Sequence, residues 1–324
     1  MPPDWPENSL FFEVKMIYYG RRFNLDASLV APVIYGQQPH RVTNLGITIS
    51  SDIRSELELL LAQYGKAIMA PRPAYYRFDC YFDATKLWVL EINTAFVDGW
   101  GTALNLSRAA NIHVNTEPLK VFPNAIATTD SVYLPEMQLF ADELQAHMCQ
   151  RLEIKNEFTG THFPAPDVYV YGRLREEFPN IYPRRGHRLD DKRNLASFEH
   201  DVWRGSYVRI PRHFAIGWTT WNEIPDSAVL KFCEKGGVES ERARASVILG
   251  KPSGKAKFLR FCYESERLIA QDRIQPILID EGSFDKFGQL IILAIDDKVV
   301  CGYVQYSSQL IISDNSIHGP LLIE

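Results

Sequence analysis

The sequence contains 324 residues, of which 46% are hydrophobic and 23% are charged. This composition indicates a soluble globular protein with room for two or three packed subdomains. The formal net charge of -5 and the lack of a long basic run argue against nucleic acid as a partner. The N-terminal segment MPPDWPENSL has no signal-peptide pattern, and no apolar run is long enough to span a bilayer. The five cysteines are scattered without a Cys-x-x-Cys pair, which favours reduced thiols in a cytoplasmic protein.

Apolar patterning predicts strands and helices in alternation along the first half of the chain. The clearest helix is 51–65, where leucines recur at helical spacing between a cap at Ser51 or Asp52 and a stop at Gly65. Strands are predicted at 10–20 and 29–36, a hairpin at 75–96 with its turn at 83–86, and further helices at 101–111 and 134–152.

The second half continues this alternation. We expect a strand at 166–172, a helix at 189–202, extended chain at 207–218, a helix at 226–237, a strand at 244–254 that runs into a Gly/Ser loop, a helical turn and strand at 265–279, and a β-meander at 288–313. Asp226 would cap the helix at 226–237, and Gly236 would end it. The whole pattern predicts an α+β or α/β fold.

The hairpin at 75–96 carries polar residues in strands that otherwise look apolar. Arg77 and Asp79 alternate onto one face of the first strand, and Glu91 and Asn93 share a face of the second. If the strands pair through their turn, the two polar pairs can meet, and two carboxylates with an amide oxygen would suit Mg²⁺. The alternative is a cross-strand ion pair with Arg77 on an exposed sheet face.

Arg77-x-Asp79 followed by Glu91-Ile92-Asn93 resembles the magnesium-binding signature of the ATP-grasp superfamily. The resemblance implies that Asp79, Glu91 and Asn93 hold the Mg²⁺ ions of ATP. It also implies that Arg77 binds phosphate or the reacting carboxylate.

Three further landmarks resemble the family's nucleotide-binding motifs. The resemblance implies that Lys192, which opens a helix, and Lys251, which follows a strand, bind phosphate, with Ser253 and Gly254 in the phosphate loop. The segment LIAQDRIQP resembles the hinge strand, which implies that Gln271 and Ile274 lie near adenine. Taken alone, Lys192 could be a solvated lysine at a helix start, and Lys251 an exposed loop lysine.

The order of these motifs differs from that of ordinary family members. The magnesium-binding hairpin usually comes last, whereas here it comes first and the chain ends with the meander. The arrangement resembles a circular permutation of the glutathionylspermidine synthase-like branch, over residues 75–324. It implies that the last strand, ending at Glu324, lies beside the strand of Arg77 and Asp79.

The resemblance also implies a domain organisation. Residues 1–118 would form the N-terminal part of the permuted ATP-grasp core with the magnesium-binding hairpin. Residues 119–190 would form a small Rossmann-like pre-ATP-grasp subdomain, and residues 191–324 the ATP-binding subdomain with lid, hinge and meander.

The function that this resemblance implies is an ATP-dependent carboxylate–amine ligase that works through an acylphosphate, with ATP and Mg²⁺ as cofactors and small-molecule or peptide carboxylates and amines as substrates. A catalytically weakened relative is the alternative, because Gln305 stands where many relatives have an arginine and the phosphate loop is poor in glycine. Arg209, Arg260 or Arg273 could supply that charge. A third interpretation is an unrelated α+β protein, and the sequence leaves a homodimer open.

Overall fold

The computed structural model describes residues 18–83, 85–128, 130–148, 153–155, 167–171, 181–183, 189, 191–201, 203–233, 247–257, 259, 268–281, 284–309 and 316–324. The predicted strand at 10–20 lies mostly outside these residues, as do the C-terminal end of the meander and Arg260.

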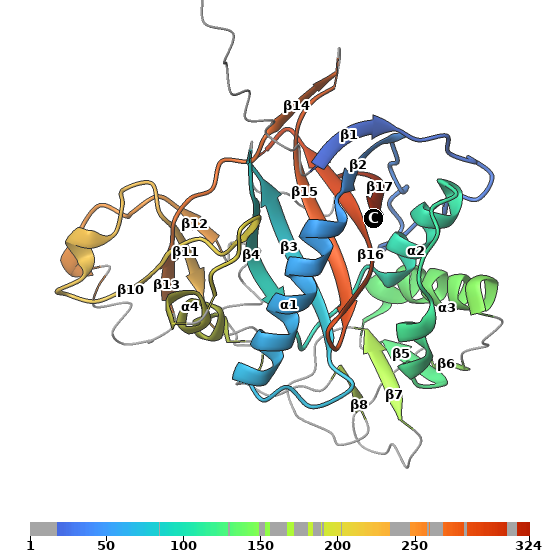
Figure 1. The fold of residues 1–324 in the computed structure, drawn as a ribbon, viewed down its shortest axis with the longest axis horizontal. Helices are drawn as coiled ribbons and strands as arrows, with labels where there is room; N and C mark the ends of the chain where they lie inside the picture. Colours follow the sequence, from blue (N-terminus) through green and yellow to red (C-terminus); the bar gives the residue numbers. More distant parts are fainter. Residues whose placement is uncertain are drawn as a thin grey trace, which may run out of the picture.

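A large mixed sheet forms the centre of the molecule (Figure 1). Within the described residues its strands follow the order β1 (Tyr18–Arg22), β2 (Leu45–Ile49), β17 (Ile317–Ile323), β16 (Lys298–Ser307), β15 (Phe284–Ile295), β3 (Tyr75–Phe82), β4 (Leu87–Asn93) and β9 (Val208–Arg209), and β14 (Leu278–Glu281) pairs with β15. The contacts β2–β17 and β4–β9 are parallel, and the others are antiparallel.

Helices cover both faces of this sheet (Figure 1). On one face, α1 (Ser51–Ala67) and α4 (Lys192–Asp201) pack on Phe78 and its apolar neighbours. On the other, α2 (Trp100–Ala109) and α3 (Leu134–Met148) pack on Tyr75 and the β15–β16 strands. Strand β3 can serve both cores because its side chains alternate between the two faces.

Two smaller sheets flank the large one. One is antiparallel, in the order β10 (His213–Ala215), β13 (Leu268–Gln271), β11 (Val229–Phe232) and β12 (Val247–Leu249). The other is parallel, in the order β6 (Glu153–Lys155), β5 (Ala125–Thr128), β7 (Val168–Tyr171) and β8 (Ile181–Tyr182). Short 3₁₀ helices occupy Glu117–Val121, Ser131–Tyr133 and Trp221–Glu223. The expectation of a mixed α+β fold is confirmed.

Three expectations from the sequence are wrong. The segment predicted as a helix at 226–237 contains strand β11, because Asp226 belongs to a turn in which the Ala228 N–H donates to the Pro225 carbonyl, and β-forming residues follow. The stretch 29–36 is a loop with an isolated bridge from Val33 to Pro39. The last strand, β17, shares the sheet of β3 but is separated from it by β16 and β15.

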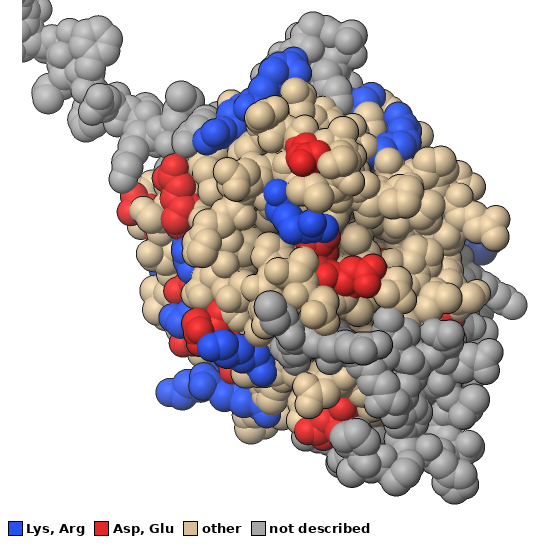
Figure 2. Space-filling model, turned by 90° about the vertical axis from the view of Figure 1, so that its right-hand side faces the viewer, with Lys and Arg blue, Asp and Glu red and all other residues tan. Residues whose placement is uncertain are grey.

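Charges of both signs are interspersed over the described part of the surface seen in Figure 2, among a majority of other residues. This mixture agrees with the near balance of 35 basic and 40 acidic residues in the sequence. No helix in the described part of the chain combines the length and apolarity needed to cross a membrane.

Candidate functional site

A β-bulge in the β3–β4 hairpin brings the four predicted polar residues together. Arg77 is paired with Asn93 and Asp79 with Glu91, and the register then slips so that Cys80 faces Val89. Leu90 is the extra residue at this slip. In a regular strand without this slip, Glu91 would lie on the same face as Val89, which packs in the core beneath α1. The bulge therefore moves Glu91 to the side of Asp79.

The Arg77 guanidinium lies between two carboxylates. Its Nε and Nη2 donate to the two oxygens of Asp79 at 2.9 and 3.2 Å, and its Nη1 donates to Asp98. Burial by itself lowers the pKa of Arg77, but the charges of Asp79 and Asp98 outweigh it and raise that pKa well above its usual value. Arg77 is thus a fixed cation, and 19% of its side-chain surface is exposed.

Glu91 and Asn93 complete the polar face from β4. The Nζ atom of Lys192, the first residue of α4, lies 3.3 Å from a Glu91 carboxylate oxygen. Asn93 is fully buried, and its Nδ2 approaches Asp79 Oδ1 at 3.4 Å. Its Oδ1 has no hydrogen-bond partner among the described residues. A buried amide oxygen of this kind is costly unless a ligand satisfies it.

These residues fit a hard cation. The three carboxylates of Asp79, Glu91 and Asp98 outnumber the two cations Arg77 and Lys192, so this group of five side chains carries one net negative charge. Together with the unsatisfied Asn93 oxygen, this is the donor chemistry that Mg²⁺ prefers. No cluster of three or more His, Cys, Asp and Glu side chains suited to a metal occurs among the described residues, so the candidate ligand set here is two carboxylates, Asp79 and Glu91, with the Asn93 amide oxygen.

The small antiparallel sheet presents polar side chains to the same strand, β4. Lys231 Nζ and Gln271 Nε2 both donate to the Leu90 carbonyl, at 3.0 and 3.1 Å. Gln271 Nε2 also lies 2.9 Å from His213 Nε2 on the neighbouring strand. Burial, followed by the charge of Lys231, lowers the pKa of His213 to about 3, so this histidine is neutral at physiological pH. The bulge thus joins the two sheets through polar groups beside Glu91.

Lys231 was missed by the sequence analysis because its segment was assigned to a helix. It is 7% exposed, and a lysine buried to this degree needs a polar partner or a ligand. The available signal was Val-Leu-Lys-Phe, a β-forming run with one cation at an alternating position.

Two tyrosines beside Asp98, Tyr35 and Tyr303, were not predicted from the sequence. Tyr35 donates to Asp98 at 3.0 Å, and a Cβ atom on Gly99 would meet the Tyr303 hydroxyl at 2.8 Å. Burial, and then the charge of Asp98, raises the pKa of both tyrosines, so both stay protonated. Nearby Trp100 is fully buried, and its Nε1 donates to the Tyr169 hydroxyl at 3.0 Å.

The other predicted nucleotide residues lie in the small sheet and its loops. Lys251 Nζ donates to the carbonyls of Trp221 and Ile224 at 3.1 and 3.0 Å and lies 3.4 Å from Asp226. Ser253 and Gly254 are exposed, with Gly254 in the left-handed region at φ +88°, and Ile274 is half-buried beyond β13. These contacts leave their nucleotide roles as predictions.

Gln305 lies in β16 opposite Gln289 of β15 and His318 of β17, in the sheet that carries Asp79. Its Nε2 lies 3.4 Å from His318 Nε2. Burial and the adjacent His40 lower the pKa of His318 to about 3. The row formed by Gln289, Gln305 and His318 across the three strands is therefore uncharged at physiological pH. Cys80 is fully buried on the face of β3 opposite Asp79, in the core beneath α1.

No family model matches the sequence, and no curated protein matches it. Among solved structures, the chain is similar to a protein of Methylobacillus flagellatus KT that is provisionally named a gamma-glutamylcysteine synthetase. The two share 10% sequence identity over 82% of each chain, with a TM-score of 0.46. A similarity of this size assigns neither a fold family nor an activity.

Proposed function

We propose that this chain is an ATP-dependent carboxylate–amine ligase with a circularly permuted ATP-grasp fold. The observation that carries the proposal is the bulged hairpin. It sets Arg77 and Asp79 opposite Asn93 and Glu91, with Lys192 beside Glu91. The hydrogen bonding of β15 to β3 further supports a permuted order, because it joins the C-terminal meander to the early hairpin.

The roles that we propose follow the chemistry of each side chain. Asp79, Glu91 and Asn93 would hold Mg²⁺, which would neutralise phosphate oxygens when it is bound with nucleotide. Lys192 and Lys231 would bind the phosphates, because both are sparsely exposed cations next to the hairpin.

The remaining nucleotide contacts are carried over from the resemblance. Lys251 would be a further phosphate lysine, with Ser253 and Gly254 in the phosphate loop. Gln271 and Ile274 would meet the adenine.

The reaction would need no protein nucleophile. Transfer of the γ-phosphoryl group to a substrate carboxylate oxygen would give an acylphosphate and ADP. The amine nitrogen would then bond to the carbonyl carbon, losing a proton, and the C–O bond to phosphate would break to leave an amide and phosphate. Arg77, fixed by Asp79 and Asp98, would bind the anionic oxygen that develops, which is catalysis by positioning and electrostatics.

A second candidate function is a weakened relative that binds nucleotide without ligation. It is favoured by the uncharged row at Gln305, because a missing cation there would reduce stabilisation of the transferring phosphoryl group. Release of ADP in the presence of acid and amine pairs would separate a ligase from a binding protein.

The first test is a thermal-shift measurement with Mg·ATP, Mg·ADP and nucleotide-free buffer. A ligand that binds only the native state stabilises it by about 2.7 kcal/mol at a hundredfold excess over its Kd. We expect the wild type to be stabilised by both nucleotides. In Asp79→Asn, the stabilisation that depends on Mg²⁺ should be lost while the nucleotide-free melting temperature is retained, because Mg²⁺ needs anionic oxygen ligands.

The matched control is Asp142→Asn, which removes an exposed carboxylate that accepts a hydrogen bond from Gln138 on α3. It should bind nucleotide like the wild type. Equal Mg·ATP stabilisation of wild type and Asp79→Asn would refute the metal assignment, and no nucleotide binding by the wild type would refute the proposed function.

A further inference from the structure

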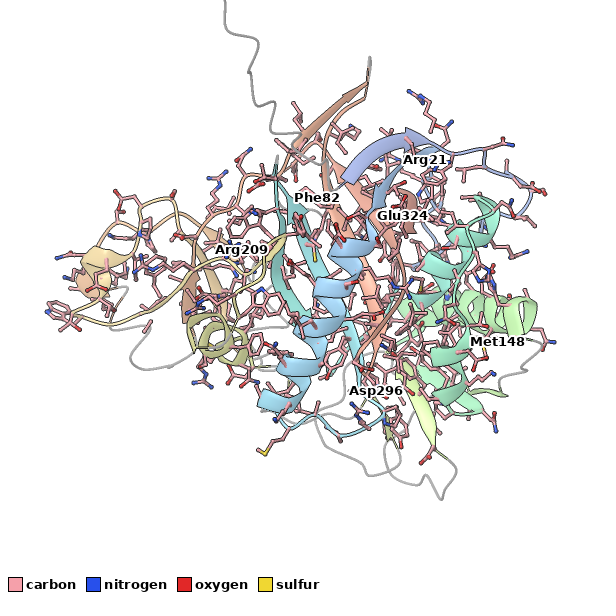
Figure 3. The ribbon with its side chains drawn as sticks, in the orientation of Figure 1. Arg21, Phe82, Met148, Arg209, Asp296 and Glu324 are labelled. Carbon is pink, nitrogen blue, oxygen red and sulfur yellow. The ribbon has the colours of Figure 1, made fainter. Side chains whose placement is uncertain are left out.

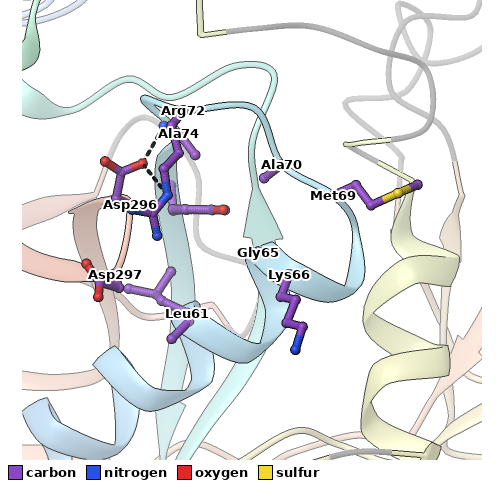
Figure 4. A pocket seen from close by; sticks show the side chains of 11 residues that line it. Leu61, Gly65, Lys66, Met69, Ala70, Arg72, Ala74, Asp296 and Asp297 are labelled. Atoms are coloured by element: carbon purple, nitrogen blue, oxygen red, sulfur yellow. Dashed lines mark hydrogen bonds and ion pairs between the residues drawn. The ribbon is translucent and has the colours of Figure 1, made fainter.

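A pocket of about 390 Å³ opens where helix α1 ends, beside the turn that joins β15 to β16 (Figure 4). This volume falls in the range of small-molecule sites, roughly 300–1,000 Å³. Its floor includes Tyr76, whose side chain alternates to the opposite face of β3 from Arg77. Asp296, at its edge, lies at the opposite end of the sheet from Phe82 (Figure 3). The pocket is therefore separate from the candidate ligase site.

One wall of the pocket carries a cation beside two acids. Asp296 is held in place because its N–H donates to the Ala74 carbonyl at 2.7 Å and its Oδ1 accepts from the Ala74 N–H at 3.0 Å. Arg72 reaches the same oxygen only loosely, with Nε at 4.0 Å, and its side chain is 74% exposed. Asp297 forms no hydrogen bond or ion pair with any described residue. The Arg72 guanidinium and the Asp297 carboxylate thus lie in the same wall, and each can still bind a group of the opposite charge.

Lys66, an exposed lysine in the last turn of α1, also lines the pocket, and the remaining lining residues are apolar. Leu61 and Tyr76 form a buried floor, and a Cβ atom on Gly65 would meet the Tyr76 hydroxyl at 2.8 Å, so glycine keeps the ring in this position. Met69 stands at the rim with 84% of its surface exposed and a positive φ of 53°. A methionine side chain adapts its shape to an apolar surface. The pocket thus combines a wall with charges of both signs, Arg72 with Asp296 and Asp297, and an apolar floor that Lys66 borders.

We propose that this pocket binds a free α-amino acid with an apolar side chain. The carboxylate pairs with the Arg72 guanidinium, which suits bidentate recognition of carboxylates. The ammonium group pairs with Asp297 and the remaining oxygen of Asp296. The side chain packs on Leu61 and Tyr76, under Met69. The ammonium and carboxylate groups of an α-amino acid are attached to the same carbon, which matches the neighbouring carboxylate and guanidinium groups of this wall.

The test is calorimetric titration of the full chain with L-leucine and with two analogues that each lack one charge, N-acetyl-L-leucine and L-leucinamide. We expect L-leucine to bind, and each analogue to bind roughly tenfold more weakly or worse, because each loses one charge-assisted contact. Asp297→Asn and Arg72→Gln should weaken L-leucine binding to the same extent. Both side chains lie at the pocket surface, so we expect both variants to fold.

Two control variants locate the binding. Lys298→Gln changes a charge next to Asp297 that contacts Glu58 and does not line the pocket, so it should bind L-leucine like the wild type. Asp79→Asn should also bind normally, which separates this pocket from an amino acid bound at the proposed ligase site. Absence of L-leucine binding to the wild type would overturn the proposal. Equal binding by all three compounds, or unchanged binding by Asp297→Asn, would also overturn it.

Discussion

Replacing Lys231 with methionine tests which lysine of the small sheet binds the nucleotide. Lys231 is 7% exposed, and its Nζ lies 3.0 Å from the Leu90 carbonyl beside the hairpin. If it contacts a phosphate, Lys231→Met removes a charge-assisted hydrogen bond of about 1.5–3 kcal/mol. That loss corresponds to roughly tenfold to more than a hundredfold in the Kd for Mg·ATP. Adenosine should bind as to the wild type, because it carries no phosphate.

The matched variant is Lys251→Met. In the wild type, Lys251 donates to two backbone carbonyls, those of Trp221 and Ile224. Losing this donor should lower the free energy of unfolding by about 1–3 kcal/mol. Lys231→Met should cost less, because the Leu90 carbonyl keeps its hydrogen bond from Gln271.

The assay is calorimetric titration of both variants with Mg·ATP and with adenosine, alongside urea denaturation. A wild-type Kd for Mg·ATP in Lys231→Met would refute the role of Lys231. A selective loss of Mg·ATP affinity in Lys251→Met would establish the phosphate-loop role predicted from the sequence.

Two further predictions concern stability. Glu56→Gln should lower the free energy of unfolding by about 1–3 kcal/mol in urea, because the carboxylate accepts from three backbone N–H groups at 206–208, whereas the exposed Glu117→Gln should have little effect. Burial lowers the pKa of His318 from 6.5 to about 3. The native state therefore binds fewer protons at this group than the unfolded state does. Its contribution to stability is lost as the pH falls from about 6.5 towards 3. His318→Gln should reduce this acid slope by at most about 1.4 kcal/mol per pH unit, measured by urea denaturation between pH 5 and 7. An unchanged slope in His318→Gln, or an equal reduction in the exposed His113→Gln, would contradict the assignment.

Local patterning predicted the hairpin well, because strand alternation and turn chemistry act over a few residues. The turn forms as expected, with Asp83 Oδ1 accepting from the N–H groups of Thr85 and Lys86 at 2.7 and 2.8 Å. The bulge was not foreseen, since an uninterrupted register from this turn would place Asp79 opposite Leu90 and Glu91 on the core face. The predicted meeting of Asp79 and Glu91 is confirmed, but it depends on a slip that alternation alone does not reveal.

Residues joined by long-range contacts were harder to predict. Tyr35 and Asp98 lie 63 positions apart, and Lys231 and Leu90 lie 141 apart, so no local pattern links either pair. Lys231 was also lost because Asp226 and Gly236 resembled a helix cap and stop, whereas sheet pairing with β12 and β13 determined the local structure. Lys192 was found only through its resemblance to a family motif, and its contact with Glu91 is a property of the tertiary fold.

The shared hydrogen bonds at Leu90 also protect an open strand edge. Within the described residues, β9 pairs only with Leu87 and Trp88, so the rest of β4 borders no other strand on that side. A free edge of this kind is a template on which another chain can add a strand and begin to aggregate. Lys231 and Gln271 occupy the Leu90 carbonyl with their side chains, so it is not available to the backbone N–H of an added strand. The same contacts that hold the small sheet against the hairpin therefore also help to keep the protein from aggregating.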